Sequence, residues 1–78
     1  SDVRKTFDIV VANIDLRSLK RMRSPLLRRL KSRGILILSG ILEGERDNLR
    51  RHYLETGDFQ SAKTTQDEGW ACLIFKKR

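Results

Sequence analysis

The chain has 78 residues, of which 38% are hydrophobic and 35% charged, and it carries a formal net charge of +7. This length provides one small domain, and the hydrophobic share is too high for a disordered chain. No run approaches the ~20 apolar residues that span a bilayer, which excludes a membrane span, and the amino terminus does not resemble a signal peptide.

Two residue types that often mark special chemistry are rare here. The lone cysteine, Cys72, lies in an apolar run, so we expect a small core residue in a reducing compartment, the cytoplasm. The lone histidine, His52, has no metal ligand at a suitable spacing. The sequence therefore predicts no disulfide and no metal site.

The first element is a short apolar stretch within Thr6 to Ile14, which ends at the polar side chain of Asn13. Such a run predicts a strand buried on both faces, as in a helix-covered parallel sheet. Asn13 then lies at the carboxyl end of the strand, where open α/β sheets bind ligands. A cap or turn role for Asn13 is the alternative interpretation.

A basic amphipathic segment follows, with eight Lys and Arg and no acid between Arg17 and Arg33. Its apolar spacing predicts a helix, and Ser24-Pro25 predicts a short turn before Ser24 and a main helix that ends before Gly34. The basic block is either a solvated helix face or a surface for phosphate, acidic protein or anionic lipid.

The middle of the chain repeats the strand-and-helix pattern. Ile35 to Leu38 predicts a second buried parallel strand, and Ser39-Gly40 follows it. Acidic residues at positions 43 and 45 suit the start of a helix, and basic residues at positions 50 to 52 suit its end, before Gly57 terminates it. The expected inner stripe of this helix is Leu42, Leu49, Tyr53 and Leu54.

The last third predicts a hairpin with unequal strands. Phe59 to Gln66 is polar, Asp67-Glu68-Gly69 is a turn sequence, and Trp70 to Phe75 is apolar without a gap. Because the final strand is too hydrophobic for a sheet edge, we expect it to insert antiparallel between the second and third strands. The predicted fold is α/β, a β-α-β-α-β-β chain with strand order 1-2-4-3.

Several motifs in register resemble a known family: FDIVVANI, GILILSGIL, Gly57-Asp58-Phe59 and EGWACLIF. From about Thr6 to Lys77 the chain resembles the carboxyl half of the ribosomal protein L-eleven methyltransferase family. These are class I S-adenosylmethionine-dependent methyltransferases that modify amino groups of a ribosomal protein. The resemblance implies a partial Rossmann-like sheet whose last strand is antiparallel. One departure is Ser32-Arg33-Gly34, which replaces the family's common Pro-Gly-Gly.

The resemblance also has consequences for the cofactor. In that family the glycine-rich loop and the ribose-binding acid lie on the first two strands of the sheet, upstream of Ser1. Residues 1–78 are therefore expected to form a single domain, the carboxyl-terminal half of a catalytic domain, inactive alone. S-adenosylmethionine is expected only with the missing half, and no cofactor-binding residue is assigned in this chain.

The resemblance implies a protein N-methyltransferase, and Asn13 is then the expected catalytic residue. A side-chain carbonyl at that strand end can orient a neutral amine without adding charge near a cationic sulfonium, and the resemblance indicates the same residue. The expected substrate-binding residues are Asn13, Ile14, Ser39, Gly40 and Ile41.

Two expectations concern partners. The alternative function is a stand-alone basic module that binds RNA or an acidic protein, with no membrane partner; it lacks the interleaved aromatic residues of single-strand binders. Its expected contacts are Arg17, Lys20, Arg21, Arg28 and Arg29. In addition, the strand at Phe7 to Ala12 lacks one of the neighbours it has in the family, so a homodimer through this edge is expected.

Overall fold

The computed structural model describes residues 5–78, without the side chains of residues 61 and 62. The single domain expected from the sequence covered residues 1–78, so its first four residues lie outside the described part. The elements in chain order are β1 (Phe7–Ala12), α1 (Leu16–Arg21), α2 (Arg23–Arg29), β2 (Leu30–Leu42), the 3-10 helix η1 (Glu43–Glu45), α3 (Arg46–Leu54), β3 (Phe59–Asp67) and β4 (Trp70–Lys77).

The strands form one mixed sheet in the order β1-β2-β4-β3. β1 pairs parallel with β2, whereas β4 runs antiparallel to both of its neighbours, β2 and β3. Glu68 and Gly69 form the hairpin turn with φ angles of 50° and 85°, and two consecutive positive φ angles suit the twist of a tight hairpin. The predicted α/β class and its antiparallel inserted strand are confirmed.

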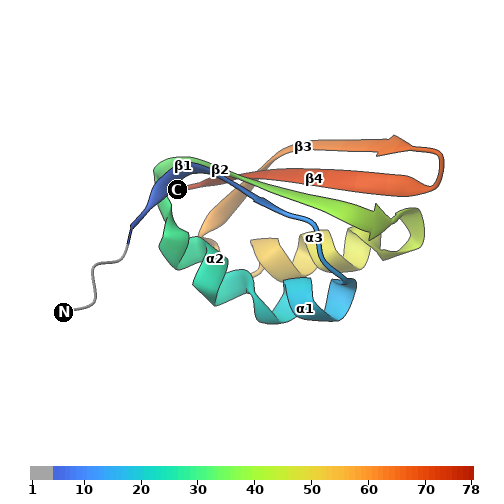
Figure 1. Cartoon of the computed structure of the whole chain (residues 1–78), viewed down its shortest axis with the longest axis horizontal. Coiled ribbons are helices and arrows are strands. Elements are labelled where there is room, and N and C mark those ends of the chain that lie inside the picture. The colour runs from blue at the N-terminus through green and yellow to red at the C-terminus, as the bar shows by residue number, and fades with distance from the viewer. Residues whose placement is uncertain (1–4) are drawn as a thin grey trace.

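All helices lie on one face of the sheet (Figure 1). Both crossovers, from β1 to β2 and from β2 to β3, move across the sheet in the same direction, so the right-handed rule places their helices on the same side. Beneath the sheet is the core, which comprises Leu19, Leu26, Leu30, Leu36, Leu38, Ile41, Leu49, Tyr53, Phe59, Ala71, Leu73 and Phe75.

The prediction that the first strand is buried on both faces is wrong. The side chains of Ile9 and Val11 are 59% and 62% exposed, because no described element covers the opposite face of the sheet. Along β2 the same alternation appears: Leu36 and Leu38 are buried, whereas Ile35 and Ile37 are half-buried. The apolar runs therefore produce one covered face and one bare face.

The helical segment after β1 also differs from its prediction. It breaks at Met22 into two short helices, Ser24 lies inside α2 instead of capping it, and α2 ends at Arg29. Pro25 is tolerated because the first turn of a helix needs no backbone N–H bonds. Arg33 then adopts φ 67°, a left-handed conformation that glycine adopts without strain.

The boundaries of the second crossover were also only partly predicted. β2 is much longer than Ile35 to Leu38, and Ile41 and Leu42 still pair with β4. Leu42 was expected in the inner stripe of the following helix, but it precedes η1 and is exposed. Leu49 and Tyr53 are buried as predicted.

Polar contacts join the helices to one another. The Tyr53 hydroxyl donates to the backbone carbonyl of Leu19, and Arg23 Nη1 donates to the carbonyl of His52 at 2.7 Å and to Glu55 Oε1 at 2.8 Å.

In the described residues, no helix has the length and apolar character needed to cross a membrane. No group of three His, Cys, Asp or Glu in this part of the chain could hold a metal ion.

Candidate functional site

The carboxyl ends of the two parallel strands bring Asn13 and Gly40 together. Ala12 pairs with Leu38, so the residues that follow each of them, Asn13 on one strand and Ser39-Gly40 on the other, lie at the same edge. A Cβ atom built on Gly40 would lie 2.0 Å from Asn13 Oδ1, and Gly40 has φ +74°. Glycine suits this position, because a side chain would be strained in this backbone conformation and its Cβ atom would displace the Asn13 amide.

Asn13 is not the cap of the following helix. That role belongs to Asp15, whose Oδ2 accepts from the backbone N–H of Ser18 at 3.4 Å. The hydrogen bond from Ser18 lowers the pKa of the Asp15 carboxyl, so this acid stays ionised. Asn13 itself is exposed, and its amide makes no hydrogen bond to any described residue. The amide is thus free to bind a ligand.

A groove of about 260 Å³ lies next to Gly40, with walls from β2, β3 and β4. Ser39 and Gly40 contribute to it from β2, whereas Trp70 and Cys72 contribute from β4. Trp70 is 53% exposed, although the apolar run around it predicted a buried strand. A tryptophan directly after a tight turn, at the very start of a strand, was the signal that could have singled it out.

Two of the predicted substrate-binding residues lie differently. The Ile41 side chain is 1% exposed and belongs to the core, so it is not available to a substrate. The alternation of side chains along β2 explains the error, since Ile41 follows the strand instead of leaving it. Ile14 is exposed just after Asn13, but it does not line the groove.

The chemical groups at this edge are mainly neutral. The amide of Asn13 lies against Gly40 but does not line the groove. The polar side chains of the groove itself are those of Ser39, Thr65, Gln66, Asp67, Trp70 and Cys72, of which Asp67 is a carboxylate. These groups can orient a polar ligand, but they include no pair of a nucleophile and a base. The groove is also smaller than the ~300 to 1,000 Å³ of typical small-molecule sites. The residues present therefore do not fit S-adenosylmethionine as a whole.

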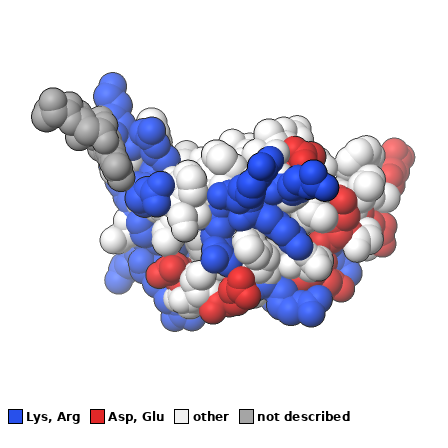
Figure 2. All heavy atoms as spheres, turned by 90° about the horizontal axis from the view of Figure 1, so that it is seen from below, with Lys and Arg blue, Asp and Glu red and all other residues white. Residues whose placement is uncertain are grey.

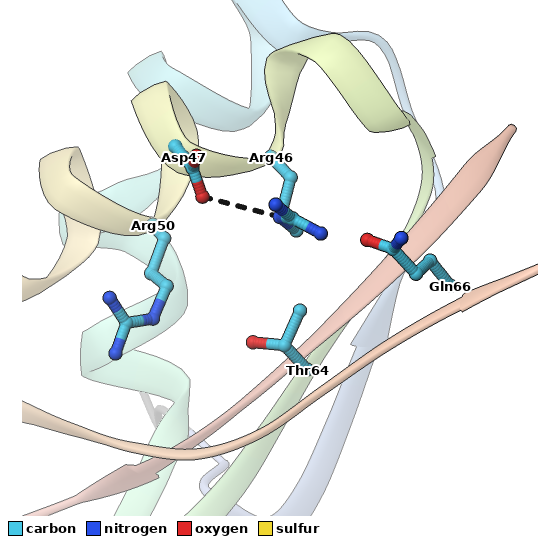
Figure 3. A pocket seen from close by; sticks show the side chains of 5 residues that line it. All are labelled: Arg46, Asp47, Arg50, Thr64 and Gln66. Carbon is cyan, nitrogen blue, oxygen red and sulfur yellow. Dashed lines mark hydrogen bonds and ion pairs between the residues drawn. The ribbon is translucent and has the colours of Figure 1, made fainter.

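A second groove, of about 400 Å³, lies between α3 and β3. Figure 3 shows Arg46 and Arg50 extending from α3 opposite Thr64 and Gln66 of β3. Its polar groups have partners: Arg46 Nε lies 3.2 Å from Asp47 Oδ1, and Gln66 Nε2 donates to Glu43 Oε1 at 3.1 Å. None of the predicted site residues lies here, so the edge at Asn13 remains the candidate site.

Comparison with known proteins identifies the lineage. The family model for ribosomal protein L11 methyltransferase (PrmA) matches residues 1–78. A ribosomal protein L11 methyltransferase of Neisseria gonorrhoeae is 40% identical over 92% of this chain, and one of Pelobacter propionicus is 33% identical over 92%. The chain spans about a quarter of these relatives, 24% and 23% of their lengths.

Solved structures agree with the sequence matches. A ribosomal protein L11 methylase from Lactobacillus delbrueckii subsp. bulgaricus superposes with a TM-score of 0.85 at 27% identity, covering 99% of this chain and 39% of that one. The N-methyltransferase NodS from Bradyrhizobium japonicum, in complex with S-adenosyl-L-homocysteine, has a TM-score of 0.71 at 13% identity over 99% of this chain and 49% of that one, which shows a common fold. The chain belongs to the ribosomal protein L11 methyltransferase family.

Proposed function

We propose that the chain forms the acceptor side of an S-adenosylmethionine-dependent protein N-methyltransferase, in which Asn13 orients the substrate amine. The observation that carries this proposal is the unbonded amide of Asn13, held against Gly40 at the carboxyl ends of β1 and β2. This edge is where open α/β sheets place their ligands.

The chemistry of amine methylation explains why an amide suits this position. An amine attacks as the neutral species, with its lone pair free and aligned at a near-attack distance of about 3 to 3.5 Å. Asn13 Oδ1 can accept one amine hydrogen, and the backbone carbonyls of Asn13 and Ile14 can accept others. None of these oxygens carries a full charge, so they orient the amine without raising its pKa as a carboxylate would.

Ser39, Gly40 and Trp70 complete the acceptor side in this proposal. The Ser39 hydroxyl lines the groove beside Gly40, and the exposed indole of Trp70 offers an apolar wall for the methylene stem of a substrate side chain. Ile14 remains as a backbone acceptor.

S-adenosylmethionine is the methyl donor in this proposal, and polypeptide other than these 78 residues holds it. The groove beside Gly40 is too small for the whole cofactor, and the chain spans a quarter of its relatives. Relatives named for ribosomal protein L11 support a ribosomal protein as substrate and the cytoplasm as location. By itself the chain should be inactive and should bind the cofactor weakly or not at all.

A hybrid protein tests this function. The corresponding segment of the Neisseria gonorrhoeae relative, which is 40% identical, is replaced by this chain, and methylation of ribosomal protein L11 is measured. We expect activity in the hybrid. Asn13→Ala should lower turnover by about tenfold or more, since an oriented acceptor of this kind contributes on that order, while cofactor affinity and Tm stay nearly unchanged.

The matched control is Asn48→Ala, which removes the same amide from the exposed surface of α3. This variant should retain full turnover. Lost stability with retained activity in Asn13→Ala would show that Asn13 has only a structural role. Micromolar binding of S-adenosylmethionine to the 78-residue chain in a calorimetric titration would refute the expected need for another segment.

A further variant, Asn13→Asp, tests the argument about charge. A carboxylate beside the amine favours the protonated ammonium form, so it raises the pKa of the amine and lowers the neutral fraction at pH 7. The pH–rate profile of the hybrid should therefore shift to higher pH, with partial recovery of turnover in alkali. An unshifted profile would contradict the proposed contact between Asn13 and the amine.

A further inference from the structure

The helix side of the molecule carries most of the excess positive charge. The two segments 15–23 and 46–55, which form α1, the start of α2 and all of α3, hold seven Lys and Arg and three acids. This excess of four charges compares with a formal net charge of +7 for the whole chain. Figure 2 views this side and shows Lys and Arg gathered over its middle, with acidic side chains mainly toward the margins.

Each of the three acids on this surface already has an ion-pair or capping partner. Glu55 pairs with Arg23 at 2.8 Å, Asp47 pairs with Arg46 at 3.2 Å, and Asp15 caps α1. Arg50 also has an interaction partner, whereas the other four cations have no ion pair with any described residue. We call this set the helix-side cations: Arg17, Lys20, Arg21 and Arg51.

The backbone that carries these cations is fixed across the two helices. His52 Nε2 donates to the carbonyl of Lys20 at 2.9 Å, and Arg23 Nη1 donates to the carbonyl of His52 at 2.7 Å. A shallow groove of about 210 Å³ lies between α1 and α3, with Lys20 on one wall and Arg51 on the other. Arg17 and Arg21 are one turn apart on the same face of α1. The cations therefore belong to one preorganised surface.

The residue composition of this surface indicates which kind of polyanion it suits: an acidic protein, a single-stranded nucleic acid or a duplex. Protein interfaces need a buried apolar or aromatic centre, but Met22, at 36%, is the exposed large hydrophobic residue of this side. Single-strand binders need stacking platforms, but Tyr53 is buried, and the exposed aromatic residues described, Phe7 and Trp70, belong to the sheet. The ring of His52 lines the groove between α1 and α3, but it is half-buried and bonded to the Lys20 carbonyl, so it is not a free stacking platform. Cations without a free stacking platform suit the phosphates of a duplex, which presents no unstacked bases.

We propose that the helix-side cations bind the phosphate backbone of a nucleic-acid duplex, independently of its sequence. The surface lies on the opposite side of the sheet from the bare face, so a duplex bound there leaves the groove beside Gly40 open. The proposal is independent of methyl transfer, since it needs neither substrate nor cofactor.

The structure also divides the basic block that the sequence presents as continuous. Arg28 and Arg29 lie in the last turn of α2, beside Lys77, whose Nζ donates to the carbonyls of Leu27 and Leu30. This end of α2 lies away from the groove between α1 and α3 (Figure 1). Arg28 and Arg29 therefore provide a control of equal charge on the same segment.

Fluorescence anisotropy with a labelled RNA duplex of about 20 base pairs tests the proposal on the 78-residue chain, with a DNA duplex of the same length in parallel. For four phosphate contacts, log Kd should vary with log salt concentration with a slope of about 3 to 4. Lys20→Gln with Arg51→Gln should weaken binding on the order of ten- to fiftyfold at 0.1 M salt and reduce this slope by about 2. Arg28→Gln with Arg29→Gln should change Kd by less than about threefold.

Several outcomes would overturn the proposal. These are equal weakening in the two double variants, a salt slope near zero for the unaltered chain, tighter binding of a single strand, or equal binding of polyglutamate, which would indicate an acidic protein instead. Lys20→Arg with Arg51→Lys keeps both charges and should retain binding within about threefold. If the glutamine variant fails to fold by circular dichroism, this charge-preserving variant and the salt slope decide the matter.

Discussion

The two faces of the sheet are built from the same strands but have different surroundings. On the covered face, Leu36, Leu38, Leu73 and Phe75 are at most 1% exposed beneath the helices. On the bare face, Ile9 and Val11 are more than half exposed. Both sets of side chains are apolar, so their hydrophobicity alone does not distinguish a core from a surface. The direction of the crossovers, which places every helix on one side, makes the difference.

The bare face is also where the proposed chemistry lies. The groove beside Gly40 has walls from β2, β3 and β4, and the exposed Trp70 lines it. The covered face, in contrast, contributes the packing that holds β1 and β2 in register, and hence holds Asn13 against Gly40. Stability and the candidate site therefore depend on opposite faces, which substitutions can separate.

The largest expected effect is on the covered face. Leu36→Ala should lower the free energy of unfolding by about 2 to 5 kcal/mol, because it removes a fully buried side chain and leaves a cavity. Ile9→Ala, on the bare face of the neighbouring strand, should cost less than about 1 kcal/mol. Urea denaturation measures both. Equal losses would mean that the bare face is covered in solution.

The sequence predicted the sheet better than its surroundings. The order of the strands followed from one contrast, the uninterrupted apolar run at the start of β4 against the polar β3, and the turn followed from Glu68-Gly69. The apolar runs of β1 and β2 do not show that only one face of the sheet is covered, because an apolar strand can be covered on one face or on both. One-sided coverage depends on crossovers between distant strands.

The sequence analysis named Asn13, Ser39 and Gly40 for the candidate site, but it did not predict that Asn13 packs against Gly40 or that Trp70 lines the groove. Asn13 was identified because the apolar run stops there. Its contact with Gly40 joins residues 27 positions apart, and it depends on the register in which Ala12 faces Leu38. Ile41 was expected to follow the strand, but it lies within β2 and its side chain is in the core, because the sequence does not show that β2 continues past Gly40. Trp70 was missed because its apolar run was interpreted as wholly buried, although its position directly after the turn indicated a strand end.

The second expected effect concerns self-association. β1 is an edge strand with exposed apolar side chains, so we expect two copies to associate through it, at the homodimer interface predicted from the sequence. Ile9→Thr with Val11→Thr keeps β-branched side chains but reduces their apolar area, and should weaken association about tenfold or more. Sedimentation equilibrium measures this change.

Leu42→Thr serves as the control, because Leu42 is also apolar and 49% exposed but lies on β2 instead of the free edge. This variant should associate like the unaltered chain. A clean monomer at high concentration for the unaltered chain would contradict the expected dimer.

A smaller effect is expected from the contact that joins α3 to α1. Tyr53→Phe removes the hydroxyl that donates to the Leu19 carbonyl but keeps the ring stacked against Phe75, with centroids 5.5 Å apart. The loss should be about 1 kcal/mol at pH 7. Burial raises the pKa of Tyr53 to about 12, so the stability that this group contributes is present below its ordinary pKa near 10 and is lost as the pH rises through 12. Urea denaturation at pH 7 and pH 11 should show that the unaltered chain loses more of its stability than Tyr53→Phe does.

The smallest expected effect is at the exposed ion pair between Arg23 and Glu55, which joins the start of α2 to the end of α3. The hydrogen bond from Arg23 holds the pKa of the Glu55 carboxyl below its ordinary value, with the nearby charges of Arg23, His52 and Lys20 acting in the same direction. A lowered pKa means that the folded chain binds this proton less readily than the unfolded chain does. The resulting stabilisation is complete above about pH 4.3, the ordinary pKa of glutamate, and is lost as the pH falls through the folded-state pKa. Glu55→Gln should therefore melt slightly below the unaltered chain at pH 7, and the two Tm values should converge in acid.

Glu68→Gln, at an exposed acid of the hairpin turn, should leave Tm unchanged at pH 7. A Tm difference for Glu55→Gln that persists unchanged into acid would show that the pair contributes by packing and not by charge.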